Sequence, residues 1–201
     1  QEDTCINGSC SAVSEKCCQD EDSMNVFILC TGRSGSVTFI SACQHITNYT
    51  AAHESRSSLL GDERFDYPSR HIEADNRLSW MLGRLDKHYG NNAFYVHLKR
   101  DLENTARSFA KRSKGIMRAY RGDGIIMGVS DSVDAYTIAL DYCHTVSTNI
   151  ELFLRDKTNK MEFYIENASD LFPQFCSKIN ADVNLDKALA EFNIRHNATP
   201  T

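Results

Sequence analysis

The chain of 201 residues has no long hydrophobic run and no excess of positive charge. No apolar stretch approaches the roughly 18–20 residues that a membrane helix requires, so we expect no membrane-spanning segment. The formal net charge of −5 argues against general affinity for nucleic acid, and no nucleic-acid partner is expected. The length and the apolar content of 41% are typical of one globular domain with an adequate core.

A glycine- and serine-rich turn follows the first apolar run, and it lacks the residues of a nucleoside-triphosphate loop. The apolar run covers residues 26–29, the turn covers residues 30–36, and a helical pattern follows. A strand, such a turn and a helix N-terminus hold a phosphate through free backbone N–H groups and the helix dipole. The triphosphate motif would need Gly, Lys and Ser or Thr where this chain has Val37, Thr38 and Phe39. The turn is therefore predicted to bind a phosphate-like anion, but not Mg-ATP.

Two motifs resemble those of sulfotransferases that use 3′-phosphoadenosine 5′-phosphosulfate (PAPS). Residues 31–39 match the family's first signature, a strand followed by Thr-Gly-Arg-Ser-Gly-Ser/Thr-x-x-Phe. The second signature is a strand that ends in Arg-Asp, with a Ser eight residues after the Arg. Here residues 95–101 end in Arg-Asp, and Ser108 follows at that spacing. The Arg in the turn, Arg33, is similar to the carbohydrate and bacterial branches, whereas the cytosolic small-molecule branch usually has Lys there.

The resemblance implies an α/β fold in three α/β/α layers around a central parallel sheet, like that of P-loop nucleotide hydrolases and kinases. It implies PAPS as co-substrate, 3′-phosphoadenosine 5′-phosphate (PAP) as product, and no metal. The loop would cradle the 5′-phosphosulfate, and Arg100 and Ser108 would hold the 3′-phosphate. Ser36 and Thr38 could instead serve only as helix caps. The residues expected to bind the donor are Arg33, Ser34, Gly35, Ser36, Val37, Thr38, Arg100 and Ser108.

A short strand that ends at His53-Glu54 supplies two candidates for a catalytic base. In many relatives a strand about twenty residues past the loop ends in Glu, so the resemblance implies that Glu54 is the general base. His53 is the competitor because imidazole titrates near neutrality. Alternation along a strand would direct only one of the two toward the donor. Arg33 is the third catalytic candidate, since it could neutralise charge on the bridging oxygen of the leaving phosphate.

Hydrophobic periodicity predicts the remaining elements. Strands are expected at residues 25–30, 93–98 and 161–165, in addition to the one that ends at Glu54. Helices are expected at residues 35–47, 72–89, 131–155, after the capping residue Asp101, and twice near the end of the chain. Strands that alternate with helices favour a parallel sheet covered on both faces. Because strand ends meet at one edge of such a sheet, Arg33, Glu54 and Arg100 are expected to converge on one crevice.

Four further expectations concern polar residues between and around the motifs. Residues 55–71 have no clear period and are interpreted as a loop over the site that carries specificity. Glu73 and Asp75 are interpreted as part of an exposed helix face. His97 lies inside a predicted strand and is interpreted as a core histidine whose hydrogen bonds are satisfied. The segment from residue 99 to residue 121 has eight basic and two acidic residues, which would form either a field for a polyanionic donor or an ordinary surface helix face.

Residues 1–23 are interpreted as a Cys-containing N-terminal extension, and residues 24–201 as a single sulfotransferase domain. Four cysteines of the extension could form two disulfides in an oxidising compartment, and their spacing is not a common zinc-ligand frame. These are Cys5, Cys10, Cys17 and Cys18. Together with four Asn-x-Ser/Thr sequences they favour a secretory lumen over the cytoplasm. The later cysteines, Cys30, Cys43, Cys143 and Cys176, are expected to be buried small hydrophobes.

The resulting functional prediction is transfer of a sulfuryl group from PAPS to an acceptor hydroxyl of a carbohydrate or small metabolite. A sugar hydroxyl is favoured because of the Arg33 branch resemblance, and amines and phenols stay open. Two alternatives belong to other classes. One is a P-loop kinase of small molecules, which the missing Lys disfavours. The other is a non-catalytic member of the fold that binds a nucleotide or a glycan.

Overall fold

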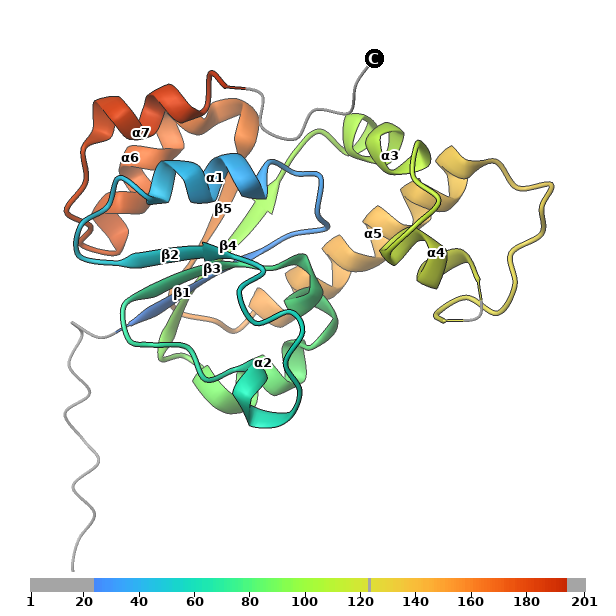
Figure 1. Cartoon of the computed structure of the whole chain (residues 1–201), viewed down its shortest axis with the longest axis horizontal. Helices are drawn as coiled ribbons and strands as arrows, with labels where there is room; N and C mark the ends of the chain where they lie inside the picture. The colour runs from blue at the N-terminus through green and yellow to red at the C-terminus, as the bar shows by residue number, and fades with distance from the viewer. Residues whose placement is uncertain (1–23, 123, 195–201) are drawn as a thin grey trace, which may run out of the picture.

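A five-stranded parallel sheet forms the centre of the protein (Figure 1). The computed structural model describes residues 24–122 and 124–194, so the predicted extension with its four cysteines lies outside the described residues. The strands are β1 (Asn25–Leu29), β2 (Thr50–His53), β3 (His71–Ala74), β4 (Ala93–Lys99) and β5 (Lys160–Tyr164), in the order β2-β3-β1-β4-β5. Every neighbouring pair is parallel. The central strand β1 is buried along its whole length, as expected of a strand covered on both faces.

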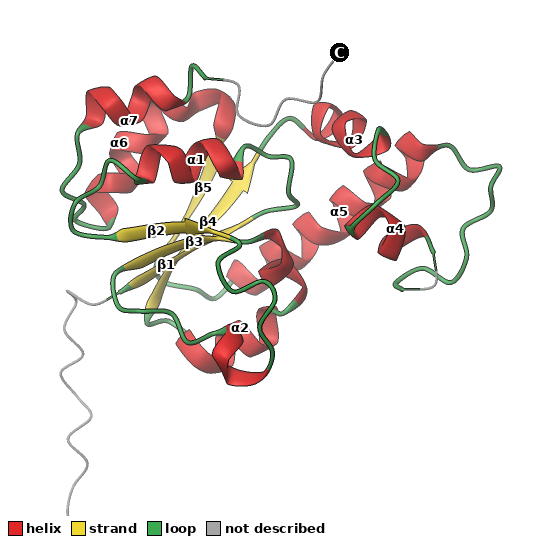
Figure 2. Ribbon diagram, viewed as in Figure 1, coloured by secondary structure: helices red, strands yellow, loops and turns green. Residues whose placement is uncertain are grey.

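Helices cover both faces of the sheet, so the predicted α/β/α layering is confirmed (Figure 2). The helices are α1 (Ser36–Cys43), α2 (Leu82–Tyr89), α3 (Leu102–Ala110), α4 (Ile116–Arg121), α5 (Ala135–Leu154), α6 (Ala168–Lys178) and α7 (Leu185–Glu191). Alternate residues of β1 serve two separate cores. Val26 and Ile28 pack with α1, α6 and α7, whereas Phe27 and Leu29 pack with α2 to α5. The period of two along the strand is what divides the apolar side chains between the layers.

The segment 72–89 is not a single helix, and that prediction was wrong. It consists of β3, a short 3₁₀ helix (Asn76–Trp80) and α2. Ile72 and Ala74 pack into the core beneath α1, while Glu73 points to the opposite face. The strand β3 is fully buried, yet it contains the polar residue Glu73, and this hid the apolar pattern by which a buried strand is recognised. Pairing of β3 with both β1 and β2 is a long-range interaction, and it overrides the local helical pattern.

Most other predicted elements are present, with small shifts of their ends. The long helix begins at Ala135, after Asp134 accepts hydrogen bonds from the amides that start it. Asp101 caps α3, since the Asn104 N–H donates to Asp101 Oδ1 at 2.8 Å. The four cysteines within the described residues are free and buried, as predicted.

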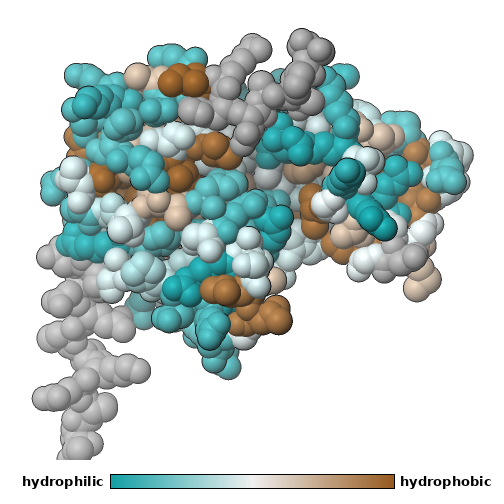
Figure 3. All heavy atoms as spheres, in the orientation of Figure 1, coloured by the Kyte–Doolittle hydropathy of each residue, from teal (hydrophilic) through white to brown (hydrophobic). Residues whose placement is uncertain are grey.

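The face of the molecule shown in Figure 3 is largely hydrophilic, with apolar side chains in small separate groups. Among the described residues, no helix combines the length and the apolar character needed to cross a membrane. The apolar side chains are instead concentrated in the two cores that flank the sheet.

Candidate active site

The turn between β1 and α1 has the backbone of an anion-binding loop. Gly32, Arg33 and Gly35 have φ values of 84°, 57° and 90°, in the left-handed region. Left-handed residues in a turn direct successive N–H groups toward one side, which creates a concave site for an anion. The Phe39 N–H closes the first turn of α1 on the Gly35 carbonyl at 2.9 Å. The helix amides that precede it have no intrahelical acceptor and can bind a ligand.

Two hydrogen bonds from the far side of the sheet hold the start of this turn. The Ser79 hydroxyl donates to the Cys30 carbonyl at 3.0 Å, and the Tyr142 hydroxyl donates to the Thr31 carbonyl at 2.6 Å. Ser34 is buried and does not line the cavity between this loop and the end of β2. The start of the loop is thus held by the 3₁₀ helix 76–80 and by α5.

The two sequence motifs meet at Arg33. Its Nε donates to Ser108 Oγ at 3.1 Å, and its carbonyl accepts from Arg100 Nη1 at 3.2 Å. Burial lowers the pKa of Arg33, and the positive charges of Arg112 and Arg100 lower it further. Guanidinium groups gathered in this way make a local field that favours a polyanion.

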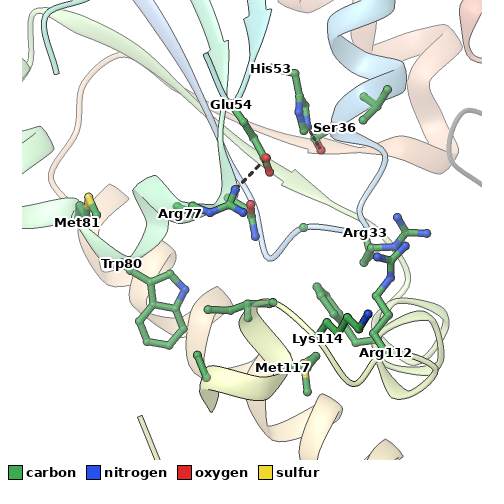
Figure 4. A pocket seen from close by; sticks show the side chains of 17 residues that line it. Arg33, Ser36, His53, Glu54, Arg77, Trp80, Met81, Arg112, Lys114 and Met117 are labelled. Carbon is green, nitrogen blue, oxygen red and sulfur yellow. Dashed lines mark hydrogen bonds and ion pairs between the residues drawn. The ribbon is translucent and has the colours of Figure 1, made fainter. Parts of the chain in front are cut away.

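A cavity of 780 Å³ opens between the loop, the end of β2, the 3₁₀ helix 76–80 and the segment 109–119 (Figure 4). This volume lies in the range of about 300–1,000 Å³ that is typical of ligand sites. Four basic side chains and one carboxylate line it: Arg33, Arg77, Arg112 and Lys114, with Glu54. Trp80 and Met81 line the side away from Arg33 and Arg112 (Figure 4). The cavity therefore has a cationic end and an apolar end, with Glu54 between them.

Both His53 and Glu54 line this cavity, so the expectation that only one would face it was wrong. Glu54 lies one residue past β2 and has a left-handed φ of 52°, which ends the strand alternation. His53 Nε2 lies 3.0 Å from Ser36 Oγ, and Glu54 Oε2 lies 2.8 Å from Arg77 Nη1. Gly35, not Ser36, occupies the N-cap position of α1. The structure thus brings one candidate base to the loop and the other to an arginine.

Comparisons with known proteins address the fold. No protein-family model matches the chain, and no curated protein matches it in sequence. Among solved structures, the sulfotransferase domain from the curacin biosynthetic pathway aligns with a TM-score of 0.59 and 14% identity, over 86% of this chain and 79% of that one. Mouse sulfotransferase SULT7A1, complexed with PAP, aligns with a TM-score of 0.52 and 15% identity, over 85% of this chain and 64% of that one.

The chain has a sulfotransferase fold. The likeness confirms the predicted α/β architecture, in which the loop after β1 and the residues after β4 lie at the same edge of the sheet. Arg100 and Ser108 do not line the cavity themselves. They lie beside it through their contacts with Arg33.

Residues 55–71 do not line the cavity, so the prediction that they form a loop over the site was wrong. Hydrogen bonds to two buried carboxylates of the β3 segment tie this loop to the sheet. The rest of the cavity lining comes instead from the 3₁₀ helix 76–80, Met81 and the segment 109–119. Hydrophobic periodicity could not indicate which segments line the cavity, because that depends on how the chain packs over the strand ends.

Glu73 and Asp75 are fully buried, so their assignment to an exposed helix face was wrong. Glu73 accepts hydrogen bonds from the Ser55 N–H and hydroxyl, both at 2.7 Å, and lies 2.9 Å from His71 Nε2. Asp75 pairs with the buried Arg64 and accepts from the Arg77 N–H at 2.8 Å. His71, Glu73 and Asp75 are spaced two residues apart, which is the period of one strand face. This spacing was the signal in the sequence that could have indicated a strand here.

The basic segment is a smaller field than its composition indicated. Arg112 and Lys114 line the cavity. Lys99 instead lies 3.2 Å from Glu151 and 2.8 Å from Glu162, both carboxylates outside the cavity lining. The cations of this segment that could form such a field are therefore Arg112 and Lys114 in the cavity lining and Arg100 beside it, whereas Lys99 is paired with carboxylates outside the cavity.

Proposed function

We propose that the protein transfers a sulfuryl group from PAPS to an acceptor hydroxyl of a carbohydrate or small metabolite. The observation that carries this proposal is the meeting of the anion loop, Arg33, Arg100 and Ser108 beside one cavity. A donor with a phosphosulfate and a separate phosphate needs two anion sites at a fixed separation. The loop and the Arg100–Ser108 pair are two such sites, joined through Arg33.

In this proposal the 5′-phosphosulfate binds the amides from residue 34 to residue 38, with Ser36 and Thr38 able to add hydroxyl donors. The 3′-phosphate binds Arg100 and Ser108. The left-handed loop and the free first turn of α1 support the first assignment. Burial lowers the pKa of Arg33 and the charges of Arg112 and Arg100 lower it further, which supports the second assignment because cations held close together favour a shared anion.

The reaction breaks the bond between sulfur and the bridging oxygen of the phosphosulfate and forms a bond from sulfur to the acceptor oxygen. The acceptor proton passes to the Glu54 carboxylate, and PAP leaves with the bridging oxygen. Arg33 lies where it can neutralise the charge that develops on that oxygen. Glu54 is favoured as the base because its carboxylate lies between the cationic and apolar ends of the cavity. His53 is the second candidate, and its contact with Ser36 gives it a route to the loop.

PAPS would supply an activated sulfuryl group, so the chain's own residues need only bind the donor, align the acceptor with it and remove the acceptor's proton. Among the described residues there is no group of three or more His, Cys, Asp and Glu that could hold a metal ion. The kinase alternative requires Mg-ATP binding by a loop that has Val37, Thr38 and Phe39 at the positions of the usual Gly, Lys and Ser or Thr.

Calorimetric titration of the purified protein with PAP, AMP and Mg-ATP tests the donor site. We expect PAP to bind more tightly than AMP, because only PAP carries the 3′-phosphate, and Mg-ATP to bind weakly. PAPS is then incubated with panels of sugars, phenols and amines, and PAP release is measured. A preference for Mg-ATP would favour the kinase, and PAP binding without transfer to any acceptor would favour the non-catalytic alternative.

A further inference from the structure

We propose that Glu73 and Asp75, two buried carboxylates outside the cavity, are positioning residues that hold Glu54 and Arg77 in their reactive geometry. The inference rests on the proposed function, because it assigns a role to residues behind the proposed base. Both carboxylates have no exposed surface. Glu73 accepts a hydrogen bond from the N–H of Ser55, the residue after Glu54. Asp75 accepts one from the N–H of Arg77.

Glu54 has a backbone conformation that it would not adopt unaided. Its left-handed φ of 52° is uncommon for a residue other than glycine. Such a conformation persists only where the surrounding structure determines it from several sides. The Glu54 N–H donates to the Ala74 carbonyl at 3.0 Å, and the next N–H, of Ser55, donates to Glu73 at 2.7 Å. The Ser55 hydroxyl adds a third bond at 2.7 Å.

Asp75 holds the partner of Glu54. One of its oxygens accepts from the Arg77 N–H at 2.8 Å and caps the 3₁₀ helix that carries Arg77. The other oxygen pairs with Arg64, which is 1% exposed. The Arg77 side chain then lies 2.8 Å from Glu54 Oε2, and both residues line the cavity (Figure 4). The two carboxylates therefore fix the backbone on both sides of one ion pair.

Buried carboxylates are not a general means of stabilising a fold. Removing two charges from water costs free energy that their pairing only partly offsets, and apolar residues of similar volume often serve as well. Here Glu73 lies on β3 and Asp75 lies one residue past its end, and both are directed at the segments that carry Glu54 and Arg77. Placement of those two side chains is a role that an apolar pair could not perform.

The test compares Glu73→Gln and Asp75→Asn with Tyr95→Phe in the whole protein. Tyr95→Phe removes a different buried hydrogen bond, from the Tyr95 hydroxyl to the Gly90 carbonyl at 2.9 Å, and Tyr95 does not line the cavity. We expect kcat for PAP release from PAPS to fall by about tenfold or more in the first two variants, because small displacements of reacting groups are costly. PAP affinity should stay within about twofold of wild type, since the anion loop is unchanged. Tyr95→Phe should leave both quantities unchanged while lowering Tm.

A second measurement does not depend on activity. The amide resonance of Ser55 reports its hydrogen bond to Glu73, so it should move upfield and lose exchange protection in Glu73→Gln but not in Tyr95→Phe. Where Glu73→Gln does not fold, Ser55→Ala removes the hydroxyl bond at an exposed position and should lower kcat with PAP affinity intact.

An unchanged kcat in both carboxylate variants, or an equal fall in Tyr95→Phe, would overturn the positioning role. An equal loss of kcat and PAP affinity would overturn it as well, because the effect would then extend to the donor site. If the wild type binds PAP but transfers nothing, the proposed function is wrong. In that case the Ser55 amide resonance still tests whether Glu73 holds the backbone next to Glu54. An unshifted Ser55 amide in Glu73→Gln would refute that role.

Discussion

Arg33 Nε donates a hydrogen bond to Ser108 Oγ at 3.1 Å, across 75 positions of the chain. This bond joins the anion loop after β1 to the helix after β4. In the proposed donor complex Arg33 contacts the 5′-phosphosulfate of PAPS and Ser108 contacts the 3′-phosphate. Binding of the 3′-phosphate at Ser108 would therefore also constrain the side chain that faces the bridging oxygen.

Arg100→Ala is expected to weaken binding of PAP by about tenfold or more, since a hydrogen bond to a charged group contributes roughly 1.5–3 kcal/mol. Binding of AMP, which lacks the 3′-phosphate, should change by less than about twofold. Calorimetry with both ligands measures the difference. Arg107→Ala is the matched control, because this exposed neighbour pairs with Glu103 one turn away. Equal losses for PAP and AMP would remove Arg100 from the 3′-phosphate site.

Glu54→Gln is expected to lower kcat by about 10²–10⁴-fold, the range for loss of a general base, with PAP affinity nearly unchanged. The steady-state rate of PAP release from PAPS, measured at saturating acceptor, gives kcat. His53→Asn is the comparison, because it removes the other candidate base and its contact with Ser36. A full rate in Glu54→Gln together with a large loss in His53→Asn would reassign the base to His53.

Gly35→Ala is expected to disturb the anion loop and to weaken PAP binding. The φ of 90° is unfavourable for a residue with a Cβ, at a cost of roughly 1–2 kcal/mol, and the added Cβ would lie 2.8 Å from Ile165 Cγ1. Denaturant unfolding and PAP titration measure the two effects. Adding Ile165→Ala should restore only part of the stability, because it removes the clash but not the φ strain.

Gly83→Ala is the control for that prediction. A Cβ at Gly83 meets no atom within 4 Å, and the residue lies inside α2. This variant should stabilise the protein by about 0.5–1 kcal/mol and leave PAP binding unchanged. PAP affinity equal to wild type in Gly35→Ala would show that the loop conformation does not matter for the ligand.

Acidification is expected to destabilise the protein through His97. Burial lowers the pKa of His97 from 6.5 to about 4, and the charge of Lys99 acts in the same direction. The unfolded chain therefore takes up a proton near pH 6.5, whereas the folded protein takes it up only near pH 4. The free energy of unfolding should fall by about 3 kcal/mol from pH 7 to pH 4 on account of this residue.

Urea unfolding at several pH values checks this expectation, with His97→Leu as the comparison. The variant has no imidazole to titrate, so its stability should fall less steeply over the same range. Identical slopes for the two proteins would show that His97 is not responsible. His97 is 2% exposed, which confirms its interpretation as a core histidine. Its buried Nδ1 has no hydrogen-bond partner among the described residues, so the expectation that its hydrogen bonds are satisfied was wrong.

The predictions that succeeded rest on local patterns. Val26 and Ile28 alternate with Phe27 and Leu29, and this alternation between two cores follows from strand geometry alone. The helix predicted to follow the loop is also present, at Ser36–Cys43. Such features are decided within a few residues of the chain, so the sequence displays them directly.

The predictions that failed concern β3 and the residues around it. His71, Glu73 and Asp75 are polar residues in a buried segment, and the hydrogen bonds that allow their burial come from Ser55, Arg64 and Arg77. The Arg77 bond is a local cap, but Ser55 and Arg64 meet the carboxylates only when the loop folds against the sheet, so no local pattern indicates them. Arg77 and Trp80 were missed as cavity residues for the same reason.

The sequence by itself determined the α/β class, the position of the anion loop and the candidates Arg33, Glu54, Arg100 and Ser108. Only the tertiary structure decided which of these residues are in contact, that Glu54 lines the cavity, and that Arg77 forms an ion pair with it. The division has a physical cause. Backbone preferences act between neighbouring residues, whereas the site is assembled by parallel strand pairing and buried hydrogen bonds between residues far apart in the chain.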